Sequence, residues 1–147
     1  MKIFITRGID KELNSFERYV CHLQGKLFEE SQCYAYGAID PYDFVEKFMN
    51  SEIASDMDDD VCYAHTWGLA QMMETLVEEL DFKPFDGNYL NYQALHWVGY
   101  MYRYWAWLGK PSREIVKIAP VEKAYMLYAG YHTLDVKEAI RLFIQRA

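Results

Sequence analysis

A run of 21 residues from Asn88 to Leu108, NYLNYQALHWVGYMYRYWAWL, constrains the fold more than any other part of the chain. It holds five tyrosines, three of the four tryptophans and almost no charge. As a helix the run would be about 30 Å long, whereas most strands are far shorter. Apolar side chains around the whole circumference are typical of a helix that is buried on most sides. The run therefore predicts a central helix over 88–108.

The same run is a poor candidate for a membrane span. Asn91, Gln93, His96 and Arg103 interrupt it, whereas spans usually show about 18 or more apolar residues in succession. A lone Arg103 near the centre of a bilayer would also be energetically costly. We therefore expect no membrane association.

Polar residues of the central helix fall on one face. Tyr92, His96, Gly99 and Arg103 follow the i, i+4, i+7, i+11 spacing of a helical stripe. Gly99 in a helix interior costs about 1 kcal/mol relative to alanine, and a close backbone contact is the usual compensation. One interpretation is that another helix packs on Gly99 and supplies carboxylates to His96 and Arg103. The other is an open cleft in which this stripe binds a ligand.

Periodicity and helix-breaking residues predict a single-domain, all-α, irregular bundle of about six to seven helices spanning residues 1–147. Asp40 and Pro41 mark a helix start, Gly109 marks the end of the central helix, and Asp135 with Glu138 forms a capping-box pattern. The other predicted helices cover 9–31, 40–50, 60–80, 112–119, 120–129 and 136–146, with loops at 51–59 and 81–88. Residues 1–8 are predicted to form a short strand or an arm.

The helical spacing also predicts which side chains are buried and where two helices begin and end. It places Phe16 and Val77 on apolar faces and Glu17 and Gln24 on exposed ones. Ser112 is the predicted N-cap of the helix that follows the central one, and Gly130 is the predicted end of the next. These are specific expectations for the packing of the bundle.

Charge divides the chain into two unequal halves. Residues 1–87 carry 7 Lys and Arg against 18 Asp and Glu, whereas residues 88–147 carry 8 against 4. An acidic front half opposes nucleic-acid binding over the whole surface and suits a basic protein partner. The strongest acidic cluster is the predicted partner-binding site and comprises Asp56, Asp58, Asp59 and Asp60. A calcium loop counted from Asp56 fails, because its sixth and twelfth positions hold Val61 and Trp67.

No catalytic motif is present, so the sequence favours a non-enzymatic protein without a cofactor or metal. The chain has no nucleophile-elbow, phosphate-loop, dinucleotide or zinc-protease pattern. Cys62 and His65 lie three apart on one helical face, but two ligands do not make a tetrahedral zinc site. His132 either shapes its turn or binds an anion or acts as an acid or base. Three cysteines and the lack of a secretion signal predict a cytoplasmic protein.

Two short helices in the basic half leave a DNA-binding alternative open. The segment SREIVKIAP-VEKAY places them on either side of a turn. The second of them is rich in Ala, Met, Leu and Tyr, which predicts burial rather than base recognition.

Four segments resemble a group of uncharacterised small bacterial proteins loosely associated with mobile, toxin–antitoxin-like loci. The segments are FVEKFMNSEIASDMD (44–58), LHWVGYMYRYW (95–105), SREIVKIAP (112–120) and AGYHTLD (129–135). The resemblance covers about residues 44–144, with GYMYRYW the most specific part. It implies a cytosolic accessory or antitoxin-like protein and assigns no functional residue.

The sequence thus leads to one main functional prediction and two alternatives. The main prediction is an acidic interaction module for a basic protein partner, with a homodimer left open by the high aromatic content. One alternative is a ligand-binding or enzymatic domain that uses Tyr92, His96, Arg103 and His132. The other is a DNA-binding regulator that uses the basic C-terminal half.

Overall fold

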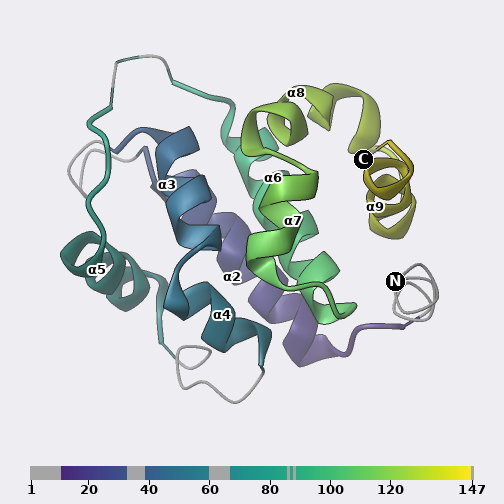
Figure 1. The fold of residues 1–147 in the computed structure, drawn as a ribbon, viewed down its shortest axis with the longest axis horizontal. Helices are drawn as coiled ribbons and strands as arrows, with labels where there is room; N and C mark the ends of the chain where they lie inside the picture. The colour runs from purple at the N-terminus through teal and green to yellow at the C-terminus, as the bar shows by residue number, and fades with distance from the viewer. Residues whose placement is uncertain (1–10, 33–38, 60–66, 86, 88, 147) are drawn as a thin grey trace.

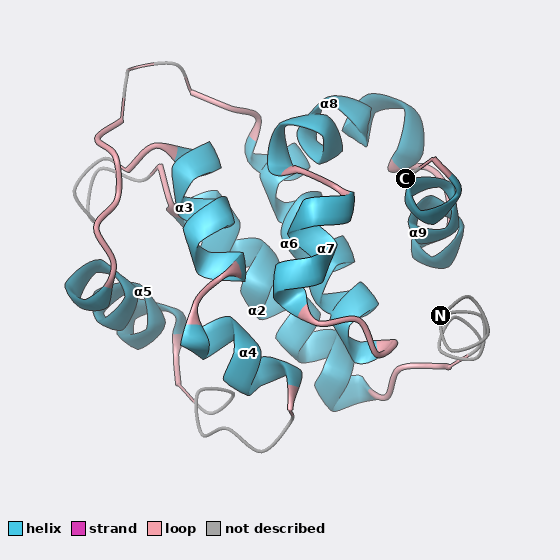
Figure 2. Cartoon of the chain, viewed as in Figure 1, coloured by secondary structure: helices cyan, strands magenta, loops and turns pink. Residues whose placement is uncertain are grey.

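The computed structural model describes residues 11–32, 39–59, 67–85, 87 and 89–146, and this part of the chain is an all-α bundle. It contains eight helices and no strand (Figures 1 and 2). One isolated antiparallel bridge, Ile39 with Pro84, joins two loops. The all-α prediction is confirmed, whereas the proposed strand or arm at 1–8 lies outside the described residues.

Two crossing helices, α2 (Ser15–Glu30) and α6 (Tyr92–Trp107), form the centre of the bundle (Figure 1). Helix α6 confirms the predicted central helix, although it begins at Tyr92 and not at residue 88, and it is buried over most of its length from Ala94 onward. The N-cap Asn91 accepts hydrogen bonds from the backbone of Gln93 and Ala94, which explains why the helix begins there. At the other end, Gly109 has a φ of 112°, as expected of a glycine just beyond a helix.

The two central helices approach closely at a pair of glycines. A Cβ placed on Gly99 would lie 2.7 Å from the carbonyl oxygen of Gln24 and 2.8 Å from the Cα of Gly25. A Cβ placed on Gly25 would lie 2.8 Å from His96. The packed interpretation of Gly99 is therefore what the structure shows, and α2 is the helix that packs there.

Helix α2 begins later than the sequence suggested and buries a different face. Its N-cap is Asn14, which forms a capping box with Glu17 that the periodicity analysis missed. Glu17 is consequently buried rather than exposed, and its carboxylate also pairs with Lys11 at 2.7 Å. Phe16 is 46% exposed, contrary to prediction, because it lies in the first turn of α2 at the edge of the buried face, which centres on Val20, Gln24 and Phe28.

Three helices cover one flank of the centre: α3 (Pro41–Met49), α4 (Glu52–Asp58) and α5 (Leu69–Glu79). Asp40 caps α3, as predicted. Helix α4 corrects the predicted loop at 51–59: Ser51 caps it, and Ile53, Ala54 and Met57 are buried. Helix α5 starts at Leu69 instead of residue 60. The buried face of α5 is formed by Met72, Met73 and Leu76. Val77 was predicted to be buried but is 41% exposed, because it lies outside that face.

The other flank consists of α7 (Ser112–Ile118), α8 (Val121–Tyr131) and α9 (Val136–Gln145). Three terminal predictions are corrected here. The N-cap of α7 is Pro111 and not Ser112, whose side chain donates to Asp58. Helix α8 does not end at Gly130 but runs through it to Tyr131. Asp135 caps α9, but Glu138 does not return a bond to it and pairs with Arg141. Helix α8 also exposes Met126, which corrects its expected burial.

Candidate functional site

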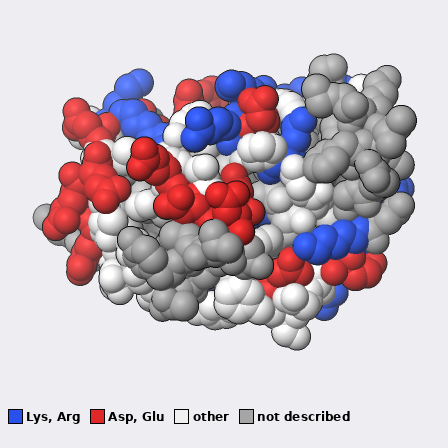
Figure 3. Space-filling model, turned by 60° about the horizontal axis from the view of Figure 1, so that its bottom comes forward, with Lys and Arg blue, Asp and Glu red and all other residues white. Residues whose placement is uncertain are grey.

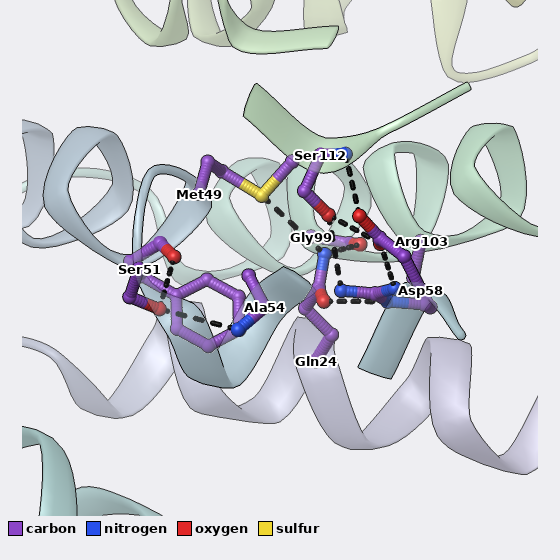
Figure 4. A network of polar contacts seen from close by, with 9 residues as sticks. Gln24, Met49, Ser51, Ala54, Asp58, Gly99, Arg103 and Ser112 are labelled. Atoms are coloured by element: carbon purple, nitrogen blue, oxygen red, sulfur yellow. Dashed lines mark hydrogen bonds and ion pairs between the residues drawn. The ribbon is translucent and has the colours of Figure 1, made fainter. Parts of the chain in front are cut away.

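A buried polar network joins four helices, α2, α4, α6 and α7 (Figure 4). Arg103 of α6 is fully buried, and its Nη1 donates to Asp58 Oδ1 of α4 at 2.6 Å. Its Nε donates to Gln24 Oε1 of α2 at 2.8 Å, and its Nη2 to Ser112 Oγ of α7 at 3.3 Å. Gln24, predicted to be exposed, is fully buried because it also donates to the Gly99 carbonyl oxygen at 3.1 Å.

Asp58 is the anionic partner of this network. Both of its carboxylate oxygens accept bonds from Ser112, from the hydroxyl at 2.6 Å and the backbone N–H at 2.8 Å. Burial lowers the pKa of Arg103, while the charge of Asp58 acts in the opposite direction. The guanidinium is thus occupied on all sides by protein groups, and Arg103 is not available to a ligand.

A second cluster of polar side chains lies around His96, where α6 contacts α2. His96 Nδ1 lies 2.9 Å from Glu29 Oε1, and His96 Nε2 lies 3.3 Å from Nδ1 of His22. The pKa of His96 is lowered, chiefly by burial, although Glu29 raises it. The His22 ring is exposed and packs edge-on to Tyr100, with 4.8 Å between ring centroids.

The remaining two predicted ligand-binding residues lie apart from these clusters. Tyr92 is the first residue of α6 and is half exposed. His132 is the C-cap of α8; it stacks on Tyr128, and its Nδ1 lies 2.7 Å from the Tyr128 carbonyl oxygen. This local bonding matches the turn-shaping interpretation of His132. Within the described residues, neither side chain shares a hydrogen bond or ring contact with His96 or Arg103.

The predicted acidic site is divided by the fold. Asp56 and Asp59 are exposed, Asp58 points into the buried network, and Asp60 lies outside the described residues. Between Lys47 and Lys83 the chain has nine acidic residues and no Lys or Arg. Figure 3 shows acidic side chains gathered on the side where α4 and α5 lie. We call the exposed acidic residues of α4, its C-cap and α5 the acidic face: Glu52, Asp56, Asp59, Glu74, Glu78 and Glu79. Asp81, which is also exposed, lies beyond the end of α5.

A pocket of about 250 Å³ opens beside the acidic face, between the end of α4 and the turn that joins α6 to α7. Its lining includes Asp58, Asp59, Gly109 and Lys110. The C-terminal ends of α4 and α6, which carry negative partial charge, both lie at this pocket. Because Asp58 is paired with Arg103, the charged groups left to face the pocket are Asp59 and Lys110, one of each sign.

Cys21 is a buried free thiol, and its environment makes it unreactive. Burial raises its pKa to about 12, so the reactive thiolate is scarce at neutral pH. Cys62 and His65, the pair considered above as possible zinc ligands, lie outside the described residues.

We expect Cys21 to react with iodoacetamide at pH 8 only after unfolding. The measurement is labelling by mass spectrometry in a Cys33→Ser/Cys62→Ser variant, with and without denaturant. Because the pKa is higher in the folded protein, the folding stability supplied by this thiol is present below its ordinary pKa of 9.0 and declines as pH rises above it. Labelling of the folded variant at the rate of the denatured one would contradict this.

Sequence reasoning found the stripe but not its partners. Gln24, Ser112 and His22 became members of the two polar clusters only through helix packing. The pairing of Gly25 with Gly99 was the one available signal, since two glycines inside predicted helices indicate a close crossing that would bring α2 against the stripe.

Comparison with known proteins adds no assignment. No protein-family profile, curated protein or solved structure matches the chain. Among the described helices, none has the length and apolar character needed to cross a bilayer. No group of three or more His, Cys, Asp or Glu side chains in the described ranges is arranged to hold a metal ion.

Proposed function

We propose that this protein is a non-enzymatic interaction module whose acidic face binds a basic protein partner. The observation that carries the proposal is the segregation of charge: nine acidic residues and no Lys or Arg lie between Lys47 and Lys83. Only Asp58 among the described members is neutralised internally by an arginine. The exposed carboxylates therefore project a negative potential that would steer a basic surface toward α4 and α5.

The pocket beside Asp59 gives this face a place for a specific contact. A lysine or arginine of the partner would enter it beside Asp59 and the C-terminal ends of α4 and α6, which carry negative partial charge. The resemblance of GYMYRYW and YHTLD to proteins of toxin–antitoxin-like loci supports a partner such as a toxin. The ligand-binding alternative gains no such support, because Arg103 is buried and paired.

A charge-reversed variant tests the proposal. The double variant Asp56→Lys/Asp59→Lys should lose capture of a basic protein from the native host's lysate, measured by pull-down and mass spectrometry. Asp58 must stay intact, because it holds Arg103 in the core. Wild-type capture should also weaken between low and moderate salt, because exposed charges are screened within about 10 Å at 0.1 M.

The matched control carries the same change in net charge on the other flank. Glu114→Lys/Glu122→Lys alters α7 and α8 and should retain the partner. Equal capture by both double variants would show that the acidic face is not the interface, and equal loss would point to net charge alone. A homodimer remains a separate prediction, which the molar mass of the purified chain would test.

A further inference from the structure

The imidazole rings of His22 on α2 and His96 on α6 form a direct contact between the two central helices. His22 Nδ1 and His96 Nε2 are 3.3 Å apart, and the ring centroids are 5.5 Å apart. The hydrogen bond between the rings needs one N–H and one bare nitrogen, because the two facing nitrogens cannot both donate. The contact therefore depends on how many protons the two rings carry together.

The pair can take up one proton without losing this contact, but not two. When one ring is protonated, its facing nitrogen donates and the neutral ring accepts. When both rings are protonated, each facing nitrogen carries a hydrogen, so no acceptor is left and two positive charges lie side by side. We propose that His22 and His96 form an acid-sensitive latch between α2 and α6, which is closed while the facing nitrogens share one proton and opens when both rings are protonated.

The packing determines which of the two rings moves when the latch opens. A Cβ placed on Gly25 would lie 2.8 Å from Cε1 and 2.9 Å from Cδ2 of His96, so the His96 ring rests against α2 where only glycine leaves room. His22 is exposed, and its ring packs edge-on to Tyr100 with 4.8 Å between centroids. Opening would therefore turn the His22 ring into solvent and break its contacts with both His96 and Tyr100.

The charged groups around the pair oppose a second proton. Glu29 Oε1 lies 2.9 Å from His96 Nδ1, at ion-pair distance but without a hydrogen bond. The same carboxylate already faces the ammonium of Lys26 at 3.4 Å, and Arg18 lies one turn from His22 on the other side. Burial lowers the pKa of His96, Glu29 raises it, and the charges of His22 and Lys26 lower it again. The latch is thus closed at neutral pH and opens in the mildly acidic range where histidines titrate.

The latch should make the stability of the protein fall on mild acidification. Because the pKa of His96 is lower in the folded protein than its ordinary value of 6.5, the unfolded chain takes up this proton first. The stability that His96 supplies is therefore full above pH 6.5 and is lost as pH falls below it. The latch lies on the α2–α6 crossing and the acidic face on α4 and α5, so this inference does not depend on the proposed partner.

The test is an NMR titration of the full-length protein from about pH 8 to about pH 5.5, a range in which most carboxylates stay ionised. The His22 and Tyr100 rings should give a nuclear Overhauser effect at the upper end that is lost at the lower end, while the spectrum remains that of a folded protein. His22→Gln should raise the pKa of His96, because the competing imidazole charge is gone. Glu29→Gln should lower the pKa of His96, because the favourable carboxylate charge is gone.

His132 supplies the control, because it lies at the end of α8 and stacks on Tyr128. His132→Gln should leave the titration of His96 and the His22–Tyr100 effect unchanged. Over the same pH range the urea midpoint should fall for the wild type and for His132→Gln, and it should fall less for His96→Gln. A His22–Tyr100 contact that persists after both rings are protonated, or a pKa of His96 that is the same in His22→Gln and the wild type, would overturn the proposal.

Discussion

Replacing Arg103 with alanine should lower the free energy of unfolding by about 3–5 kcal/mol, the usual cost of removing one member of a buried ion pair. The change would leave the Asp58 carboxylate facing the protein interior without its counter-ion. It would also remove one hydrogen-bond partner from Gln24 and one from Ser112, and open a cavity among four helices. Urea denaturation at neutral pH, followed by tryptophan fluorescence, measures the effect.

An exposed arginine of α7 supplies the control for this experiment. Arg113→Ala removes the same charge from the surface and should change stability by less than about 0.5 kcal/mol. A similar small effect of Arg103→Ala would mean that Arg103 contributes little to the fold. The open-cleft alternative would then regain support.

A double-mutant cycle separates the ion pair from the rest of the network. Asp58→Asn should be destabilising alone, because the fully buried Arg103 would keep its charge without a carboxylate. In the Arg103→Met background the same substitution should cost much less, since the charge that needs compensation is gone. Additive effects of the two changes would contradict direct coupling between α4 and α6.

The sequence predicted elements of the fold wherever one local signal dominated. Asp40 and Pro41 supply an N-cap and a first-turn proline, so α3 begins where expected. Helix α4 was missed because it is only seven residues long and ends in aspartates, which resemble a solvated loop. Its formation depends on the tertiary burial of Ile53 and Met57 and on the Asp58–Arg103 pair, and local patterns do not encode either.

The candidate site was predictable only in part, for a related reason. The stripe of His96, Gly99 and Arg103 lies on one helix, so spacing alone identifies it. Its partners come from elsewhere in the chain: Gln24 is 79 residues from Arg103, and Asp58 is 45 residues away. Such pairings are set by how the helices cross. The sequence therefore could not distinguish Asp58, which pairs with Arg103, from the neighbouring aspartates that face solvent.

The helix crossing itself should be highly sensitive at Gly99. We expect Gly99→Ala to lower the free energy of unfolding by about 2–3 kcal/mol, as estimated from typical overpacking costs. The new methyl group would lie 2.7–3.0 Å from backbone atoms of Gln24 and Gly25, which cannot move unless α2 shifts away from α6. That shift would also strain the hydrogen bond from Gln24 to the Gly99 carbonyl oxygen. The free energy lost through overpacking is expected to exceed the gain of about 1 kcal/mol from the higher helix propensity of alanine.

Gly130 provides a matched control within the same protein. It lies in α8, is exposed, and a Cβ placed there would meet no atom within 4 Å. Gly130→Ala should therefore stabilise the protein by about 0.5–1 kcal/mol, because only the gain in helix propensity applies. Chemical denaturation of both variants compares the same substitution with and without an opposing helix. Opposite signs are expected, and equal stabilisation by the two changes would show that α2 and α6 do not cross closely at Gly99.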